Sequence, residues 1–304
     1  MTLPAFKRPT YARHYEDNCQ LNEANGSRTW ITRGANLVVS VTQAAAGTTL
    51  VRDNNPDEYM LILPDETGAT LTTTAENVSV HGNTLNILPP GRSEVMVSNA
   101  GTVVRIFSNR AHDLCELSIN AETYAAAVDG VAPLENWPDP IGGFKIRSYD
   151  LRQFLDEGGP MIQPRLFRST NLMVNVFAPW HKLRDTTKLG PHWHDDFEQA
   201  SLAVRGTFVH HIRYPWNSDL SDWLPDEHTE IGSPSVTIIP PPLVHTTRNL
   251  TTDDVRLIDI FAPPRIDFSL RPGFVINAKE YPMPTNIEAD NIEMAANLSS
   301  WSKS

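Results

Sequence analysis

The sequence predicts an all-β protein built from two similar barrels in tandem. The 24 prolines and 16 glycines lie largely between short runs rich in β-branched residues, a pattern typical of many strands joined by turns. The second half of the chain is echoed in the first, because each contains an apolar run with a turn glycine and a later apolar run with a proline-rich turn. At 304 residues and 40% hydrophobic content, the chain can form two ordinary domains with buried cores.

The second unit carries the residues that indicate chemistry. His192 and His194 are separated by one residue, so they lie on the same face of an extended strand. Glu198 and Gln199 follow shortly afterwards, and His245 comes about fifty residues later behind a proline-rich turn. Three imidazoles with a carboxylate or amide oxygen can enclose a divalent transition metal and leave coordination positions open for water or substrate.

These residues resemble the two sequence motifs of the cupin superfamily. Residues 190–206 are similar to the first motif, which has paired histidines, an acidic or amide ligand, a short apolar strand and a turn glycine. Residues 232–249 are similar to the second motif, although Pro242 stands where the family usually has glycine. The resemblance implies a bicupin, with two tandem double-stranded β-helix (jelly-roll) barrels. Among bicupins, the chain resembles the ring-cleaving dioxygenases of gentisate and salicylate.

The resemblance implies that His192, His194 and His245 bind the metal, and it leaves the fourth ligand open. Counting back from the turn glycine places that ligand at Gln199, whereas a shorter spacing places it at Glu198. Neighbouring residues of a strand point to opposite faces, so only one of the pair can face the metal, and we favour Gln199. One divalent ion per chain is expected, with Fe(II) preferred and Mn, Ni or Zn as alternatives.

The first unit repeats the spacing without the histidines. Its proline-rich turn ends in Gly91, which places Glu94 at the position of His245, and no histidine occurs near residues 52–54. We therefore expect a degenerate barrel without a metal site that packs against the second barrel or another subunit. The alternative is that Glu58, Arg92 and Glu94 bind some other ligand.

Three segments separate in the sequence. Residues 1–130 form the degenerate barrel, residues 144–281 the metal-binding barrel, and residues 282–304 a polar C-terminal tail. The alanine-rich stretch 116–129 predicts a short helix before the proline-rich boundary.

Three further side chains are candidates for substrate binding, while no catalytic residue is assigned. Arg213 could bind a carboxylate with two parallel hydrogen bonds. His210 and His211 are neighbours, so only one of them can face the barrel interior. His181 precedes the paired histidines by eleven residues and is placed at the barrel mouth.

Composition excludes several classes of partner. A net charge of −11 argues against nucleic acid, which requires a basic surface. The two cysteines are too few for a disulfide framework, and we find neither a signal-peptide core nor an apolar run of the ~18 residues that a spanning helix needs. We expect a soluble cytoplasmic homo-oligomer that binds a small anionic molecule.

Three functional classes fit a metal cage of this kind. The first is a non-haem Fe(II) dioxygenase acting on a small aromatic or enolisable carboxylic acid. The second is a non-redox isomerase, lyase or hydrolase acting on a sugar acid or keto acid, in which the metal polarises a substrate oxygen. The third is a binding protein without catalysis. The resemblance favours the dioxygenase.

Overall fold

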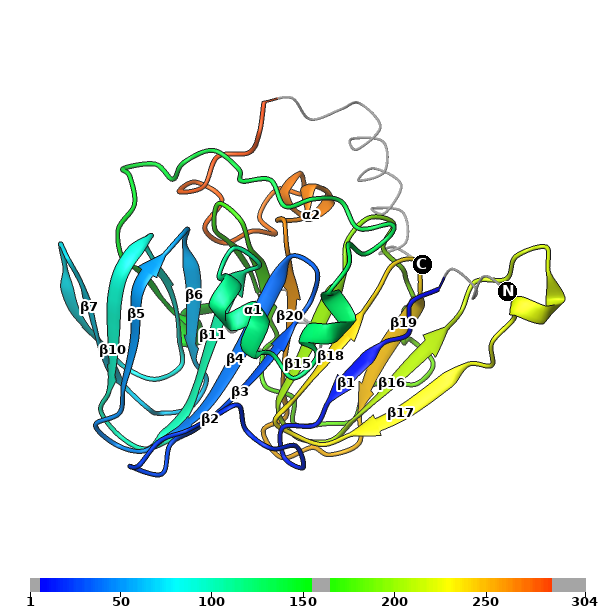
Figure 1. Cartoon of the computed structure of the whole chain (residues 1–304), viewed down its shortest axis with the longest axis horizontal. Helices are drawn as coiled ribbons and strands as arrows, with labels where there is room; N and C mark the ends of the chain where they lie inside the picture. The colour runs from blue at the N-terminus through cyan, green and yellow to red at the C-terminus, as the bar shows by residue number, and fades with distance from the viewer. Residues whose placement is uncertain (1–5, 155–164, 286–304) are drawn as a thin grey trace.

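The computed structural model describes residues 6–154 and 165–285 and confirms the all-β fold of two tandem jelly-roll barrels (Figure 1). Four sheets lie in consecutive layers across the molecule. The two large sheets, of seven and six strands, occupy the centre, and the four-stranded and three-stranded sheets lie on the outside. Each barrel therefore consists of one inner and one outer sheet.

The first barrel combines a seven-stranded sheet, in the order β12-β9-β6-β11-β4-β3-β2, with a four-stranded sheet, in the order β5-β10-β7-β8. Its strands are β2 (Leu21–Asn22), β3 (Arg28–Arg33), β4 (Leu37–Ala44), β5 (Thr49–Asn55), β6 (Tyr59–Leu63), β7 (Ala69–Thr73), β8 (Asn77–Val80), β9 (Thr84–Leu88), β10 (Gly91–Val97), β11 (Gly101–Ser108) and β12 (Arg147–Asp150).

The second barrel combines a six-stranded sheet, in the order β1-β18-β15-β20-β14-β13, with a three-stranded sheet, in the order β17-β16-β19. Its strands are β1 (Thr10–Ala12), β13 (Leu166–Arg168), β14 (Met173–Val176), β15 (Gln199–Arg205), β16 (Phe208–Arg213), β17 (Glu227–Ile231), β18 (Ser235–Ile239), β19 (Val244–Asn249) and β20 (Arg256–Phe261).

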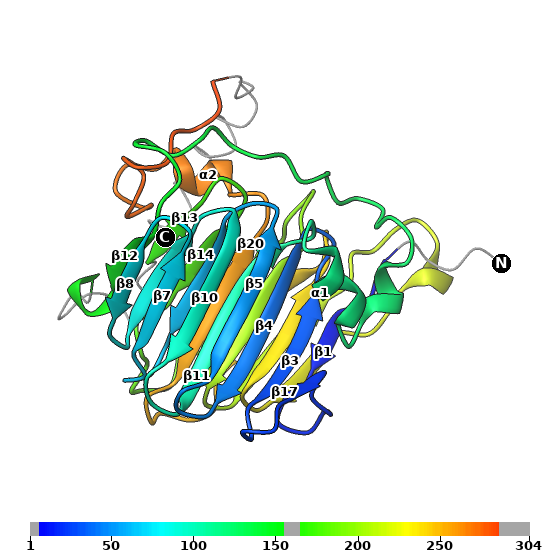
Figure 2. The same cartoon turned by 60° about the vertical axis from the view of Figure 1, so that its left-hand side comes forward.

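The strands of the two large sheets are apolar on both faces because both faces are covered. On β11, Val103 and Phe107 point into the first barrel, whereas Val104 and Ile106 point toward the second barrel. Figure 2 shows the large sheets stacked one behind the other. A buried aliphatic side chain stabilises the fold by roughly 1.5–3 kcal/mol, so this shared layer is a major part of the core. It is formed by Val39, Val41, Met60, Ile62, Leu85, Ile87, Val104, Ile106, Val174, Val176, Ala200, Leu202, Val236, Ile238, Ile258 and Ile260.

The barrels also exchange strands. β1, near the start of the chain, pairs antiparallel with β18 of the second barrel. β12, which follows the connection between the barrels, pairs antiparallel with β9 of the first barrel. Strand pairing thus differs from a clean division into residues 1–130 and 144–281. Most of the expected tail, residues 282–304, lies outside the described residues.

The predicted helix over residues 116–129 was wrong in extent. The structure has α1 (His112–Leu117) and a short 3-10 turn, η1 (Ala121–Tyr124), with an extended residue, Ser118, between them. Ala125–Ala127 lie exposed beyond the turn. Alanine propensity alone does not maintain a short helix in water without an apolar face to bury.

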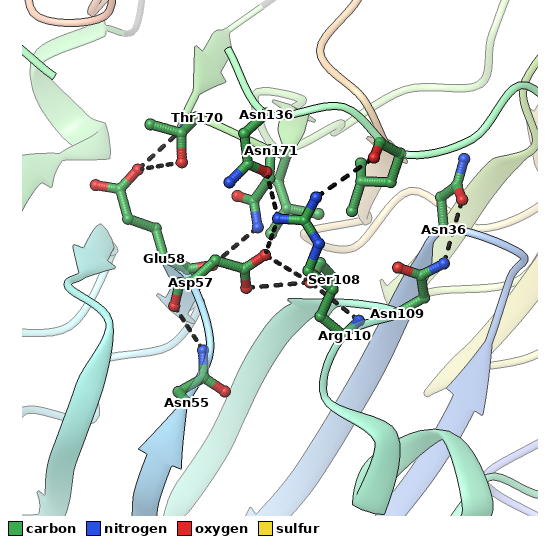
Figure 3. Close-up of polar contacts among 12 residues, drawn as sticks. Asn36, Asn55, Asp57, Glu58, Ser108, Asn109, Arg110, Asn136, Thr170 and Asn171 are labelled. Carbon is green, nitrogen blue, oxygen red and sulfur yellow. Dashed lines mark hydrogen bonds and ion pairs between the residues drawn. The ribbon is translucent and has the colours of Figure 1, made fainter. Parts of the chain in front are cut away.

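A buried polar network joins the barrels beside the shared apolar layer (Figure 3). The Glu58 carboxylate accepts hydrogen bonds from the backbone N and Oγ1 of Thr170, at 3.1 and 3.0 Å, and from the Tyr281 hydroxyl at 3.0 Å. Asn171 donates to the Glu58 backbone carbonyl, and the neighbouring Asp57 accepts from Ser108. Glu58 is fully buried, and its contacts make it part of the connection between the barrels.

None of the helices in residues 6–154 and 165–285 combines the length and the apolarity needed to cross a membrane.

The shared layer predicts that the second barrel does not fold well alone. A fragment of residues 144–304 keeps every proposed metal ligand but loses β1, exposes the apolar face of its large sheet and leaves β12 without its partner. Exposed apolar surface of this size promotes association. We expect the fragment to aggregate or to unfold without cooperativity in size-exclusion chromatography and urea titration, whereas the full chain does neither. A monomeric fragment with a cooperative transition would contradict this view of the interface.

Candidate metal centre

Three histidines converge inside one end of the second barrel. His192 and His245 face each other in an isolated antiparallel bridge, with reciprocal backbone N–O distances of 3.1 and 2.7 Å. One nitrogen each from His192, His194 and His245 lie within 4.8 Å of one another. His194 and His245 are buried and His192 is exposed, so the cluster is open to solvent on the His192 side.

Gln199, the first residue of β15, completes the cluster. Its Oε1 lies 3.0 Å from Nε2 of His194 and 3.3 Å from Nε2 of His245. The structure therefore brings Gln199 together with the three histidines that the motifs indicate. We call these four residues the cage.

Glu198 points the other way, as alternation on a strand requires. Its carboxylate accepts a hydrogen bond from the backbone N of Ala35 at 2.6 Å, from the Tyr124 hydroxyl at 3.1 Å, and from Lys7 Nζ at 3.3 Å. Ala35 and Tyr124 belong to the N-terminal half of the chain. Glu198 thus joins the two halves and lies outside the cage.

The protonation pattern of the cage suits a metal ion. Nδ1 of His245 lies 2.9 Å from the Leu243 carbonyl, and Nδ1 of His192 lies 3.2 Å from the Gly190 carbonyl. A carbonyl can only accept, so each Nδ1 carries the proton and each Nε2 has a free lone pair. At His245 that lone pair faces the Gln199 oxygen. Two acceptor atoms in contact repel each other unless a cation lies between them, so this donor set fits a divalent ion.

Burial keeps these imidazoles neutral. It lowers the pKa of His245 to about 3 and holds the pKa of His194 well below its usual range, with the charge of Arg265 acting in the same direction. Phe197 stacks on His194 with a ring-centroid distance of 4.5 Å and restricts its rotation. Neutral, immobilised imidazoles are the form that binds metals.

Asp259 of β20 is a functional candidate that the motifs did not indicate. Its carboxylate accepts a hydrogen bond from Ser201 Oγ at 2.8 Å and also interacts with the Gln199 side chain. A carboxylate accepts from the amide nitrogen, which directs the Gln199 oxygen toward the histidines. Burial raises the pKa of Asp259 to about 6. The signal in the sequence is one acidic residue within the apolar run 257–261.

The structure separates the three predicted substrate-binding residues. His210 is buried inside the second barrel, where Nδ1 lies 2.9 Å from Thr247 Oγ1 and Nε2 has no partner among the described residues. Arg213 lies on the outer face of β16 and forms an ion pair with Asp226. His181 is exposed in the loop before the cage. Of the three, His210 alone lies in the barrel interior.

Arg265 is a positive charge close enough to act on all three cage histidines. It packs 3.9 Å from the Phe268 ring centroid and pairs with Asp267. Burial lowers the pKa of His192, His194 and His245, and the charge of Arg265 acts in the same direction.

The first barrel has a different register from the one we predicted. A bulge between Gly91 and Ser93 at the start of β10 shifts the pairing by one residue. Ser93 pairs with Thr73, the fifth residue of β7, just as His245 pairs with Ile212, the fifth residue of β16. Ser93 is buried, whereas Glu94 faces outward and pairs with Arg92. The counterpart of His245 is therefore Ser93, and the assignment of Glu94 was wrong because the spacing from the turn does not show which residue of β10 faces the barrel interior.

Comparisons with known proteins support the fold. No protein-family profile matches the chain, and no curated protein does. Among solved structures, the oxalate decarboxylase of Bacillus subtilis, studied for its Mn(II) centres, aligns with 94% of this chain and 86% of its own at 11% identity and a TM-score of 0.55. The formate complex of Lactobacillus farciminis oxalate decarboxylase aligns with 93% of this chain and 95% of its own, at 12% identity and a TM-score of 0.55.

This chain shares the two-barrel cupin fold with those enzymes. Neither is a ring-cleaving dioxygenase, so the expected likeness to gentisate and salicylate dioxygenases has no support from these comparisons. At this level of identity the alignment establishes the fold alone.

The placement of Gln199 and Glu198 predicts different effects for two neighbouring substitutions. Gln199→Ala removes the cage oxygen and should weaken metal binding by at least tenfold. Glu198→Ala should leave metal content near that of the wild type and lower stability by roughly 1–3 kcal/mol, because buried donors lose their acceptor. Metal analysis after dialysis and urea unfolding measure the two effects. Loss of metal only in Glu198→Ala would show that the cage is assigned one residue out of register.

We expect one metal ion per chain, lost when the paired histidines are removed. His192→Ala combined with His194→Ala should abolish stoichiometric binding while the barrel stays folded, because apolar packing forms most of its core. Metal-to-chain ratio and circular dichroism provide the check. A second tightly held ion in the wild type, or an unchanged ratio in the double variant, would contradict the assignment.

Proposed function

We propose that the second barrel is a metal-dependent enzyme site that acts on a small carboxylic acid without net oxidation, as a lyase or isomerase does. The observation that carries the proposal is the cage itself, where imidazole lone pairs and the Gln199 oxygen converge beside an opening at the exposed His192. The residues that would hold the ion are His192, His194, His245 and Gln199.

The ligand set determines which substrates the site favours. All four donors are neutral, so the cage itself leaves the charge of a divalent ion uncompensated. An anionic substrate suits such a site, because opposite charges attract strongly where water is largely excluded. When bound, the ion would polarise a substrate oxygen as a Lewis acid.

Asp259 is the group placed to handle a proton. Asp259 lies inside the barrel beside Gln199. Its side chain is half-buried, so solvent still reaches part of it. Ser201 holds one carboxylate oxygen at 2.8 Å, which keeps the side chain in one orientation. A carboxyl group with a pKa of about 6 populates both protonation states near neutral pH, so it can deliver a proton to a carbanion in its acid form or remove one from an acidic carbon in its carboxylate form.

The comparisons favour the non-redox class over the dioxygenase that the sequence motifs favoured. The solved structures of the same fold include enzymes named for decarboxylation of an acid, and one of them is described with Mn(II) centres. We therefore propose Mn(II) or Fe(II) as the ion. An Fe(II) dioxygenase remains the second candidate, because three imidazoles with open coordination positions also suit iron and O₂.

Turnover without O₂ is the expected outcome of a substrate screen. The full-length metal-loaded protein would be incubated with small dicarboxylic, keto and sugar acids and with gentisate and salicylate, in anaerobic and aerobic vessels. Acid consumption at equal rates in both vessels supports the proposal. O₂ uptake stoichiometric with substrate loss selects the dioxygenase. Saturable binding of an acid without turnover would replace both with a binding protein.

Asp259→Asn should separate proton transfer from metal binding. The amide keeps the size and hydrogen-bonding reach of the side chain but cannot exchange the proton, so we expect kcat to fall by roughly 10²–10⁴ with metal content retained. Ser201→Ala is the matched control, since it removes a partner of Asp259 and should have a smaller effect on kcat. Unchanged kcat in Asp259→Asn would remove this residue from the mechanism.

A further inference from the structure

The first barrel keeps a polar centre of opposite charge at the position of Asp259. Strand register relates the two barrels residue by residue: Leu61 pairs with Arg105 as Ser201 pairs with Asp259. The same registers place Arg52, Tyr59 and Ser93 of the first barrel at the positions of His192, Gln199 and His245. An arginine thus occupies the place of the buried acid.

Arg105 is buried without a counter-ion. It is 6% exposed, and its neighbours Val104 and Ile106 face the other barrel, so its side chain points into the first barrel. Its Nε is buried without a hydrogen-bond partner, and no ion pair or hydrogen bond links Arg105 to another residue in the described part of the chain. A guanidinium carries its N–H donors on Nε and on both Nη atoms, and here Nε is buried with its donor unpaired.

Another buried arginine shows how this chain normally satisfies such a group. Arg165, 5% exposed, donates to the backbone carbonyls of Val176, Leu151 and Phe177, at 2.6, 2.8 and 2.6 Å. Arg105 has no comparable set of acceptors. Its interior position is therefore not explained by hydrogen bonding within the fold.

Other polar atoms in the same layer also lack partners. Ser40 of β4 lies directly opposite Arg105. On the other side of Arg105, Leu61 of β6 pairs with Arg105 and in turn with Asn86 of β9, so Asn86 lies in the same row two strands away. Ser40 Oγ and Asn86 Oδ1 are both buried without a hydrogen-bond partner. A donor hydroxyl and a cation in one layer of a barrel match the needs of an anion with several oxygen atoms.

Arg52 does not compete for that anion. It donates to both carboxylate oxygens of Asp113 on α1 and, through Nε, to Asn55 Oδ1. Its guanidinium and that of Arg105 lie 5.3 and 5.6 Å from the Phe107 ring centroid, and Tyr59 stacks on the same ring at 4.8 Å. Arg52 is thus paired with Asp113, whereas Arg105 forms no ion pair among the described residues, and only the more distant charges of Glu23 and Asp113 act on it.

We propose that the first barrel binds one small oxyanion, a carboxylate or an inorganic oxyanion of phosphate size, on the guanidinium of Arg105 with help from Ser40. This site is independent of the metal cage and of the proposed function. It makes the barrel that lacks the cage histidines a second ligand-binding barrel, with specificity for an anion in place of a cation.

Calorimetric titration and thermal unfolding test the proposal. The full-length His192→Ala, His194→Ala protein, whose cage no longer holds metal, would be titrated with acetate, sulfate and inorganic phosphate in buffer free of other small oxyanions. We expect saturable binding of one anion per chain and a rise in Tm with anion concentration. Tighter binding of acetate identifies a carboxylate site, and tighter binding of phosphate or sulfate an inorganic oxyanion site.

Variants of two arginines make the result specific. Arg105→Met should weaken anion binding by at least tenfold and leave Tm in anion-free buffer unchanged or higher, because an unpaired buried charge is removed. Arg92→Met, which removes an exposed arginine paired with Asp53 and Glu94 on the same barrel, should bind the anion like its parent. If Arg105→Met does not fold, Arg105→Lys should fold and bind more weakly. No saturable binding by the parent protein, undiminished binding in Arg105→Met, or equal loss in Arg92→Met would overturn the proposal.

Discussion

The face-to-face packing of the two large sheets is the constraint on which the rest of the structure depends. It makes strands such as β6 and β11 apolar on both faces, since one face fills a barrel and the other fills the interface. It also explains why β1 and β12 cross to the opposite barrel, where each extends a large sheet at its edge. Neither barrel presents a complete surface to water without the other.

The same packing positions the cage. β15 begins at the interface, so alternation directs Glu198 toward Ala35 and Tyr124 and the next residue, Gln199, toward the histidines. Asp259 of β20 lies opposite Ser201, two residues after Gln199 on β15, and so belongs to the same layer of the barrel. Gln199 is therefore the next residue in the chain after Glu198, which is anchored in the contact between the barrels. The first barrel supplies no ligand, but its contacts with Glu198 help to position Gln199.

The two barrels show how one scaffold accommodates opposite charge. Asp259 and Arg105 occupy equivalent positions, each with a hydroxyl or amide in the same layer of the barrel. The acid is paired with Ser201, whereas the arginine has no acceptor in the described residues. The first barrel lacks the cage histidines, yet its core is not entirely apolar, because Arg105 stands at the position equivalent to Asp259.

The sequence by itself predicted the fold class and the three histidines that the structure brings together. Short apolar strands between proline and glycine turns specify a β protein, and the paired histidines and the later His245 indicate three imidazoles that converge, His245 on β19 and His192 in an isolated bridge beside it. Only the tertiary structure showed that Gln199, and not Glu198, faces the histidines, and that Ser93, and not Glu94, occupies the position equivalent to His245. It also revealed Asp259 and Arg105. Each of these depends on the register between strands far apart in the chain or on which face the other barrel covers, and residue spacing carries none of that information.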